Sequence, residues 1–285
     1  MSLENMSKML AKARDKKYAV GAFNILDYNS TKAVVVAAEE LDAPVIIQTS
    51  AKTVIFWGAS AIICWVRQLA CDSKVPVALH LDHCKDLDLI KECIEAGWTS
   101  VMIDASSKPF DQNLDLSQQV VAMAKPKDVS VEAELGAIVG VEDDIHVKEQ
   151  DSHLADPAQA AEFCSKVAVD CFAPAIGTAH GLYKGEPKIA FELLEEIAIK
   201  TGKPLALHGG TGLSEDVFQR CIALGAAKVN ISTQLKYAHI DSFVAYHNAN
   251  SSEYNPLKVL AAQYDELKEA VSGNIKLFGS AGQAV

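Results

Sequence analysis

Short apolar runs alternate with longer segments of helical periodicity along almost the whole chain. Eight runs rich in β-branched residues predict strands, at residues 18–24, 44–50, 75–83, 100–106, 130–136, 169–177, 204–210 and 227–232. A helix-like segment follows each run, and those at 88–97 and 191–202 end on glycine, as helices commonly do. The runs are apolar on both faces, which is typical of buried parallel strands.

Eight strand–helix units within about 250 residues predict an α/β protein with a (β/α)8 TIM barrel. We expect one catalytic domain over residues 1–285, with an extra amphipathic helix at the N-terminus and another beyond Asn255. An open, doubly wound sheet is the competing architecture. The longest gap between strands, residues 136–168, is irregular and acidic, and a loop of that length is usually functional or mobile.

Composition narrows the functional classes. Hydrophobic residues make up 49% and charged residues 22%, as in a globular protein. The 26 basic and 37 acidic side chains give a formal net charge of −11. Because phosphate backbones need a basic footprint, this charge excludes nucleic acid as a main partner and disfavours anionic lipid. The net negative charge does not exclude binding of one small phosphate group at a locally positive site.

The sequence also argues against a membrane or secreted protein. The most apolar stretch, residues 54–66, is too short for a span of about 20 residues and predicts a buried core helix. The first residues contain no continuous apolar segment of a signal peptide. The seven cysteines have no CxxC spacing, which predicts reduced thiols in a cytoplasmic protein.

Polar side chains collect where the predicted strands end, which is the active-site face of such a barrel. Three histidines, His83, His180 and His208, follow the third, sixth and seventh strands. Three imidazoles from separate strands, with a fourth position open, are the ligand set of a catalytic Zn²⁺ site. The other polar residues on this rim are Asp82, Asp104, Glu134, Asn230, Ser232 and Thr233. His80, three residues before His83, is expected either in the core or directly behind the metal ligands.

Glycine-rich turns follow the sixth and seventh strands, at residues 175–181 and 208–212, and Ser214 then predicts a helix N-cap. Glycine lets backbone amides approach a ligand closely. The loops after strands seven and eight are the usual phosphate site of this fold. Together these turns predict a phosphate site.

These residues resemble the class II, metal-dependent ketose-bisphosphate aldolases, whose fructose- and tagatose-specific members share this pattern. The resemblance rests on the motifs HLDH (80–83), SVMID (100–104), SVEAELG (130–136), VED (141–143), AIGTAHGLYKGEP (175–187) and LHGGTGL (207–213). The motifs occur in the same order as in that family, and the resemblance covers nearly the whole chain. The length of the chain and the spacing of its motifs are most similar to those of the tagatose-bisphosphate aldolases.

The resemblance implies a function and a metal set. The enzyme would reversibly cleave a ketose 1,6-bisphosphate into dihydroxyacetone phosphate and glyceraldehyde 3-phosphate through a zinc-stabilised enediolate. His83, His180 and His208 would hold the catalytic Zn²⁺. Asp104 and Glu134 would serve a secondary metal position or hydrogen-bond the ligand histidines. The resemblance also implies a monovalent cation, Na⁺ or K⁺, near the phosphate, and a homodimer or homotetramer.

It further implies catalytic and substrate-binding residues. Asp82 would exchange the hydroxyl proton of the substrate, and Glu142, in the acidic loop, would shuttle the carbon-bound proton. The substrate would contact Ser50, Gly181, Lys184, Gly209, Gly210, Thr211, Asn230, Ile231, Ser232 and Thr233. Fructose-specific relatives often carry an acidic residue at the position of Ser232 and tagatose-type relatives an alanine, so a neutral serine favours tagatose.

The chemistry of the residues agrees with a metal route. Zn²⁺ stabilises the negative charge that develops when the carbon–carbon bond breaks, and a carboxylate removes the hydroxyl proton. The alternative route is a Schiff-base lysine. However, Lys184 lies beyond a strand end in a loop, and Lys228 begins the eighth strand, at the end of the barrel expected to lie away from the site.

Three other functions compete with this interpretation. The chain could be an aldolase for another phosphorylated sugar. It could be a non-catalytic barrel supporting another aldolase subunit, although such a chain should have lost ligands that are complete here. A metal-dependent hydrolase or isomerase would not need the phosphate loops.

Overall fold

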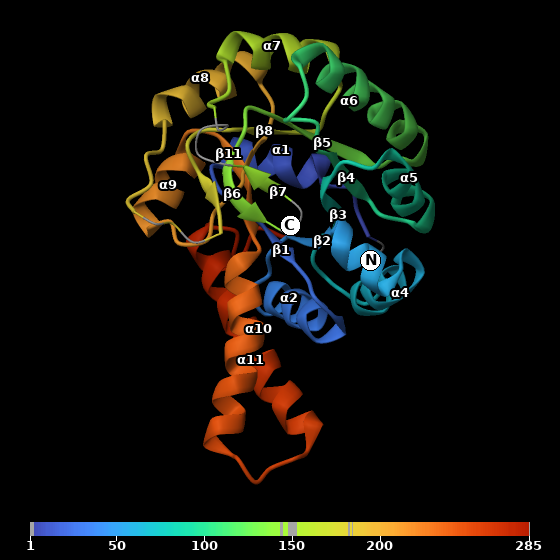
Figure 1. Cartoon of the computed structure of the whole chain (residues 1–285), viewed down its shortest axis with the longest axis vertical. Coiled ribbons are helices and arrows are strands. Elements are labelled where there is room, and N and C mark those ends of the chain that lie inside the picture. The colour runs from blue at the N-terminus through green and yellow to red at the C-terminus, as the bar shows by residue number, and fades with distance from the viewer. Residues whose placement is uncertain (1–2, 143–144, 148–152, 182, 184, 285) are drawn as a thin grey trace.

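Eight parallel strands close into a barrel in the computed structural model, which describes residues 3–142, 145–147, 153–181, 183 and 185–284 (Figure 1). Around the ring their order is β1, β11, β10, β8, β5, β4, β3 and β2. Their bounds are β1 Val20–Asn24, β2 Val45–Ser50, β3 Val77–Cys84, β4 Ser100–Ile103, β5 Ser130–Leu135, β8 Cys171–Pro174, β10 Leu205–Leu207 and β11 Ala226–Ile231. All eight predicted strands are confirmed, and closure of the ring rejects the open sheet.

Helices surround the barrel (Figure 1). Their bounds are α1 Met6–Lys16, α2 Tyr28–Glu40, α3 Ala51–Trp57, α4 Ala59–Ala70, α5 Leu87–Ala96, α6 Phe110–Ala124, α7 Pro157–Lys166, α8 Phe191–Thr201, α9 Glu215–Ala223, α10 Thr233–Ala249 and α11 Pro256–Leu277, with a 3₁₀ turn η1 at Lys125–Lys127. Polar side chains cap several of them: Ser214 accepts a hydrogen bond from the Val217 amide, as predicted. The helices at α5 and α8 end at Gly97 and Gly202 in the left-handed conformation, also as predicted.

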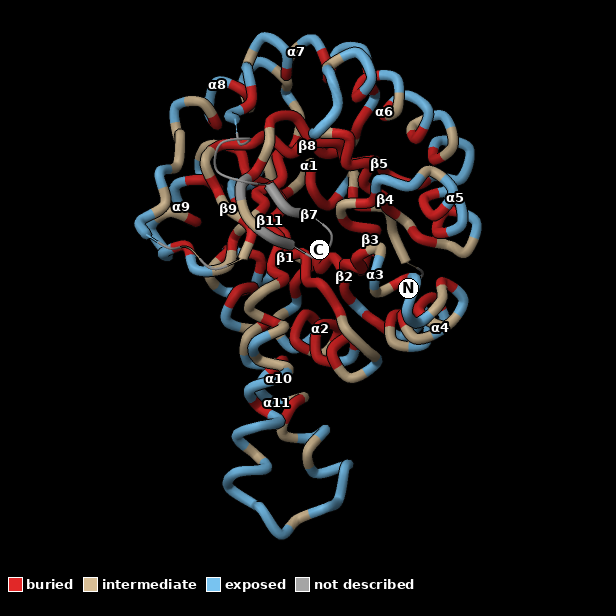
Figure 2. The backbone as a smooth tube through the Cα atoms, viewed as in Figure 1, coloured by how far each residue is buried: buried red, intermediate tan, exposed pale blue. Residues whose placement is uncertain are grey.

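The predicted N-terminal helix closes one end of the barrel. Its buried residues, among them Met6 and Leu10, pack against small inward-facing side chains of the strands such as Ala78 and Ala206. The Met6 amide donates to Ser130 Oγ at the start of β5. The helix α1 therefore covers the amino-terminal end of the barrel. Figure 2 shows the barrel as the buried centre of the molecule.

The apolar stretch at residues 54–66 forms two helices, so the expectation of one buried core helix is wrong. Gly58, at φ 82°, separates α3 from α4, which are bent by 98°. On α3, Ile55 and Phe56 are 73% and 77% exposed. Within the described residues no single helix is long and apolar enough to cross a membrane. Taken together, α3 and α4 are long and apolar enough for a span, but only by length and composition.

Two of the three strands of a small second sheet lie in the segment expected to be irregular. The sheet has the order β7-β6-β9, with β6 Val139–Glu142, β7 Ile145–Val147 and β9 Ala179–His180. Gly140 pairs with His180 in register, and a Cβ on Gly140 would lie 2.2 Å from the His180 carbonyl oxygen. Only glycine therefore allows this strand to pass so close to a predicted metal ligand.

The C-terminal helices α10 and α11 form a hairpin that projects from the barrel (Figures 1 and 2). Large apolar side chains on it are exposed, among them Ile240 at 61%, Phe243 at 53% and Tyr254 at 81%. None of the seven cysteines forms a disulfide in the described structure; Cys64 and Cys71 are exposed and the other five are buried.

Candidate active site

The three predicted metal ligands meet at the carboxyl ends of the strands. One ring nitrogen each from His83, His180 and His208 lies within 4.8 Å of the other two. His83 Nε2 and His208 Nδ1 are 2.8 Å apart. All three imidazole rings are buried or nearly so. The structure therefore brings together three side chains that are 97 and 28 residues apart along the chain.

An irregularity in β3 lets two consecutive residues serve the site. Neighbouring side chains of a regular strand point to opposite faces, yet both Asp82 and His83 contact site residues. The pairing of β3 with β4 shifts register between Leu81 and Cys84, and His83 has a left-handed φ of 46°. Such strained residues often mark functional positions.

The hydrogen bonds of two histidines leave lone pairs facing each other. His208 Nε2 lies 2.7 Å from Glu132 Oε1, and His83 Nδ1 lies 3.3 Å from Asp104 Oδ2. A neutral imidazole that donates from one nitrogen presents a lone pair at the other. His83 Nε2 and His208 Nδ1, which face each other, are then both acceptors. A proton on His83 or a metal ion shared by both nitrogens resolves this arrangement, and carboxylate-oriented histidines are usual around metals.

Buried carboxyl groups surround the same point. Burial and the adjacent Asp104 raise the pKa of Glu134 well above its usual range. Burial disfavours charge on His83, but Asp82, Asp104 and Glu134 outweigh it and raise the pKa of His83. Glu134 Oε2 lies 3.6 Å from His208 Nδ1 and has no hydrogen-bond partner in the described part of the chain. These residues fit a divalent cation with nitrogen ligands.

The other two histidines favour their neutral form. Burial, reinforced by His83 and His208, lowers the pKa of His180 well below its usual value. Burial and His83 likewise lower the pKa of His208. The neutral imidazole is the form that binds metal.

Asp82 is held by two amide side chains. Asn24 Nδ2 donates to its Oδ2 at 3.1 Å, and Asn230 Nδ2 donates to its Oδ1 at 3.2 Å. Gln48 in turn donates to Asn24 Oδ1 at 2.9 Å. Burial opposes ionisation of Asp82, but the charges of His83 and Lys228 outweigh it and lower the pKa of this carboxyl. Asp82 is therefore an oriented carboxylate beside the three histidines.

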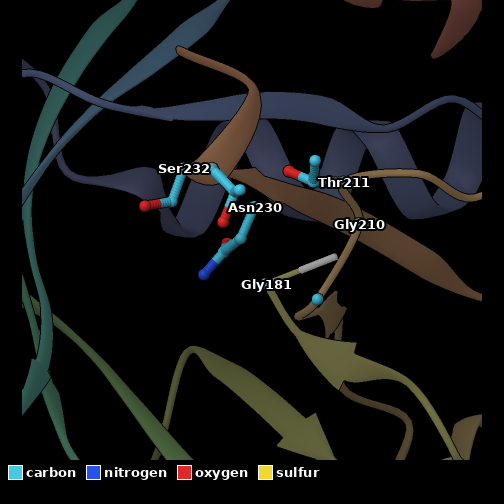
Figure 3. Close-up of a pocket in the computed structure, with 7 residues that line it drawn as sticks. Gly181, Gly210, Thr211, Asn230 and Ser232 are labelled. Atoms are coloured by element: carbon cyan, nitrogen blue, oxygen red, sulfur yellow. The ribbon is translucent and has the colours of Figure 1, made fainter. Parts of the chain in front are cut away.

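A small hollow opens beside this cluster, and Figure 3 shows residues that line it. Seven of the predicted substrate-binding residues line it: Gly181, Gly209, Gly210, Thr211, Asn230, Ser232 and Thr233. None of them is charged. The helix α10 begins at Thr233 without an acidic residue in its first turn, so its N-terminus favours an anion. The buried Ser232 Oγ makes no hydrogen bond to the described residues.

Close backbone packing shapes this hollow. Gly209 has a φ of 67°, and a Cβ there would lie 2.4 Å from the Ala179 carbonyl oxygen. The Tyr183 hydroxyl donates to the Gly209 carbonyl oxygen at 2.8 Å and accepts from the Ala179 amide at 3.1 Å. Tyr183 thus ties together the loops after β9 and β10. Tyr183 was not predicted as a site residue, although it lies within the AIGTAHGLYKGEP motif.

Two further buried residues were missed or misjudged. Glu132 was not predicted, although it shares a strand face with Glu134 two residues later. Lys228 was expected away from the site. Its backbone does pair with Val20 near the strand starts. However, its side chain extends along the barrel interior, and Nζ lies 3.0 Å from Glu132 Oε2 and 2.7 Å from Asn230 Oδ1.

The remaining predicted residues lie at or beyond the edge of the site. Ser50 pairs with Asp82 in register and caps α3 by accepting from the Thr53 amide. Ile231 is 1% exposed and belongs to the hydrophobic core rather than to the hollow. Glu142 ends β6, but its side chain falls outside the described part of the structure. Lys184 also lies outside the described residues.

Comparison with known proteins agrees with this geometry. Residues 4–283 match the model of the family fructose-bisphosphate aldolase, class II. The chain is 42% identical over 287 residues to fructose-bisphosphate aldolases from Geobacillus stearothermophilus and Staphylococcus aureus strain Mu50. Each match covers 100% of this chain, together with 99% of the Geobacillus protein and 100% of the Staphylococcus protein. The crystal structure of the YdjI aldolase from Escherichia coli K12 has a TM-score of 0.88 at 32% identity, covering 99% of this chain and 100% of that one. The chain belongs to the class II fructose-bisphosphate aldolase family.

Proposed function

We propose that the chain is a zinc-dependent ketose-bisphosphate aldolase. It reversibly cleaves a ketose 1,6-bisphosphate into dihydroxyacetone phosphate and glyceraldehyde 3-phosphate. The observation that carries this proposal is the convergence of His83, His180 and His208 beside Asp82 and a neutral, amide-rich hollow. A metal-dependent hydrolase would need no such hollow beside the metal.

His83, His180 and His208 would hold Zn²⁺, with Asp104 and Glu134 orienting them or serving a second metal position. The bound ion would act as a Lewis acid on the substrate's oxygens and stabilise the charge that develops as the carbon–carbon bond breaks. The tautomers favoured by Glu132 and Asp104 support this assignment.

Asp82 would act as the acid–base group. In cleavage its carboxylate removes the proton of the hydroxyl next to the breaking bond, and in condensation it returns that proton to the aldehyde oxygen. The amides of Asn24 and Asn230 orient both carboxylate oxygens for this task. We assign the transfer of the carbon-bound proton to Glu142 on the strength of the family resemblance.

The hollow would bind the phosphate of the dihydroxyacetone phosphate moiety. Its glycines expose backbone amides, Ser232 supplies a hydroxyl without another partner among the described residues, and the N-terminus of α10 favours negative charge. Ser50, Lys184 and Ile231 are proposed as further contacts, and Na⁺ or K⁺ as a cation beside the phosphate, because the resemblance implies them.

Two sugars are the proposed substrates, fructose and tagatose 1,6-bisphosphate. The names of the relatives at 42% identity support fructose. The neutral Ser232 supports tagatose. These epimers differ at one hydroxyl, so one or two hydrogen bonds separate them.

We also propose a cytoplasmic homodimer or homotetramer built from single-domain chains. Seven cysteines without a disulfide support a reducing compartment. The exposed apolar side chains of α10 and α11, and of Ile55 and Phe56 on α3, support association between chains.

Substitution of the ligands tests the metal site. His83→Ala and His208→Ala should each lose bound zinc and aldolase activity together, because two nitrogens cannot hold the ion as three do. Zinc is measured by elemental analysis of the purified protein. His153→Ala, which removes an exposed histidine, is the matched control and should keep both. Full activity of either variant without zinc would refute the ligand assignment.

A further inference from the structure

A second layer of polar side chains lies inside the barrel beneath the proposed metal site. His80, Glu132 and Lys228 precede Asp82, Glu134 and Asn230 by two residues on the same three strands, so each pair faces the interior. All three of the lower residues are 0% exposed. The lower layer is a set of charged and polar groups at positions where a barrel usually packs apolar side chains.

Lys228 is the centre of this layer because it contacts two different parts of the site. Its Nζ lies 3.0 Å from Glu132 Oε2, and Glu132 Oε1 lies 2.7 Å from His208 Nε2. The same Nζ donates to Asn230 Oδ1 at 2.7 Å, and Asn230 Nδ2 donates to Asp82 at 3.2 Å. One ammonium group is thus a single residue away from both a histidine ligand and the acid–base carboxylate.

Each contact fixes an orientation that the proposed chemistry needs. While Glu132 accepts from His208 Nε2, the lone pair of His208 lies on Nδ1, toward the other histidines. While Asn230 Oδ1 accepts from Lys228, its NH₂ group must point toward Asp82. A buried ion pair is costly to desolvate, and an apolar pair of similar volume is often as stable. Stability alone therefore does not explain a lysine at this position.

We propose that Lys228 is a positioning residue that orients His208 through Glu132 and Asp82 through Asn230. The inference rests on the proposed zinc site. It goes beyond that site, because Lys228 touches neither the metal nor the substrate. Metal binding and proton transfer are then coupled through one buried side chain.

Three variants separate these two effects: Lys228→Met, Glu132→Gln and the double variant. Met is close to Lys in length but carries no charge, and Gln keeps an oxygen that accepts from His208 without needing a counter-ion. Zinc affinity is measured by competition with a chromophoric chelator, and kcat and KM with zinc-saturated protein. Lys203→Met is the control, because that lysine donates to the Val169 backbone carbonyl away from this layer.

Lys228→Met should weaken zinc binding by about 10- to 100-fold, as loss of a group that orients a metal ligand typically does, and should lower kcat. In the double variant zinc affinity should return to within a few-fold of wild type, because Glu132→Gln removes the charge that needs a counter-ion. The kcat should remain low, because Asn230 still lacks the hydrogen bond from Lys228 that orients it toward Asp82. A purely structural role would not produce this split.

Wild-type zinc affinity and kcat in Lys228→Met would overturn the inference. Circular dichroism shows whether Lys228→Met folds. If it does not, the double variant is used instead, because it leaves neither member of the Lys228–Glu132 ion pair as an unpaired buried charge. A wild-type kcat in the double variant would overturn the inference. A wild-type protein that bound no zinc would instead remove the metal site and this inference with it.

Discussion

Asp82 has an environment that suits proton transfer because both of its oxygens are occupied by amide donors rather than by a salt bridge. Asn24 and Asn230 orient the carboxylate from the paired strands β1 and β11. Burial opposes ionisation, but the charges of His83 and Lys228 keep this carboxyl ionised, which is the form that accepts a proton.

We expect Asp82→Ala to keep bound zinc and lower kcat by about 10²–10⁴-fold, the usual contribution of an acid–base group. Elemental analysis and steady-state kinetics measure the two effects. Asp115→Ala, which removes an exposed carboxylate on α6, is the control. A near-normal kcat in the Asp82 variant would end its assigned role.

At the residue scale, the alternation of strand residues explains what sequence reasoning found and missed. The strand-end rule identified Asp82, His208 and Asn230. The same alternation, followed two residues back, leads to Glu132 and Lys228, which a search restricted to the strand ends does not reach. The left-handed His83 was also beyond prediction, because a register shift depends on how β3 and β4 pair.

At the scale of elements, the phosphate hollow depends on loops that approach one another more closely than side chains allow. Gly209→Ala would place a Cβ 2.4 Å from the Ala179 carbonyl oxygen and force the loop after β10 away from the hollow. Loss of one hydrogen bond to a charged group costs about 1.5–3 kcal/mol. We therefore expect KM to rise by about tenfold or more.

The control for this prediction is Gly273→Ala on α11, where an added Cβ meets no atom within 4 Å. It should leave KM unchanged, and alanine should favour the helix. An unchanged KM in Gly209→Ala would show that the close approach of the loops is not needed for phosphate binding.

Element boundaries were predicted well where a local signal exists. Apolar runs located the eight strands, and Gly97, Gly202 and Ser214 marked helix ends. The break at Gly58 and the strands β6 and β7 were missed. A glycine inside an apolar run is compatible with one helix or two, and the short strands form by pairing with β9 rather than by their own pattern.

At the scale of the molecule, the projecting hairpin of α10 and α11 exposes apolar side chains that a monomer would leave in water. Ile240, Phe243 and Val244, spaced three and four residues apart on α10, are 61%, 53% and 48% exposed. We expect light scattering after size exclusion to give a dimer or tetramer.

A charge on this face should lower that mass. Phe243→Lys should give a smaller species, whereas Ile199→Lys, at an exposed position on α8, should not. A wild-type monomer would contradict the proposed assembly.

The central claim is metal-dependent cleavage of a ketose 1,6-bisphosphate, and a paired assay tests it most directly. Cleavage of fructose and tagatose 1,6-bisphosphate is measured with and without a chelator. We predict that the zinc-loaded protein cleaves at least one of them, that the chelator abolishes cleavage, and that added Zn²⁺ restores it. The ratio of kcat/KM then identifies the preferred sugar. Cleavage that survives complete metal removal, or no cleavage of either sugar, would contradict the account.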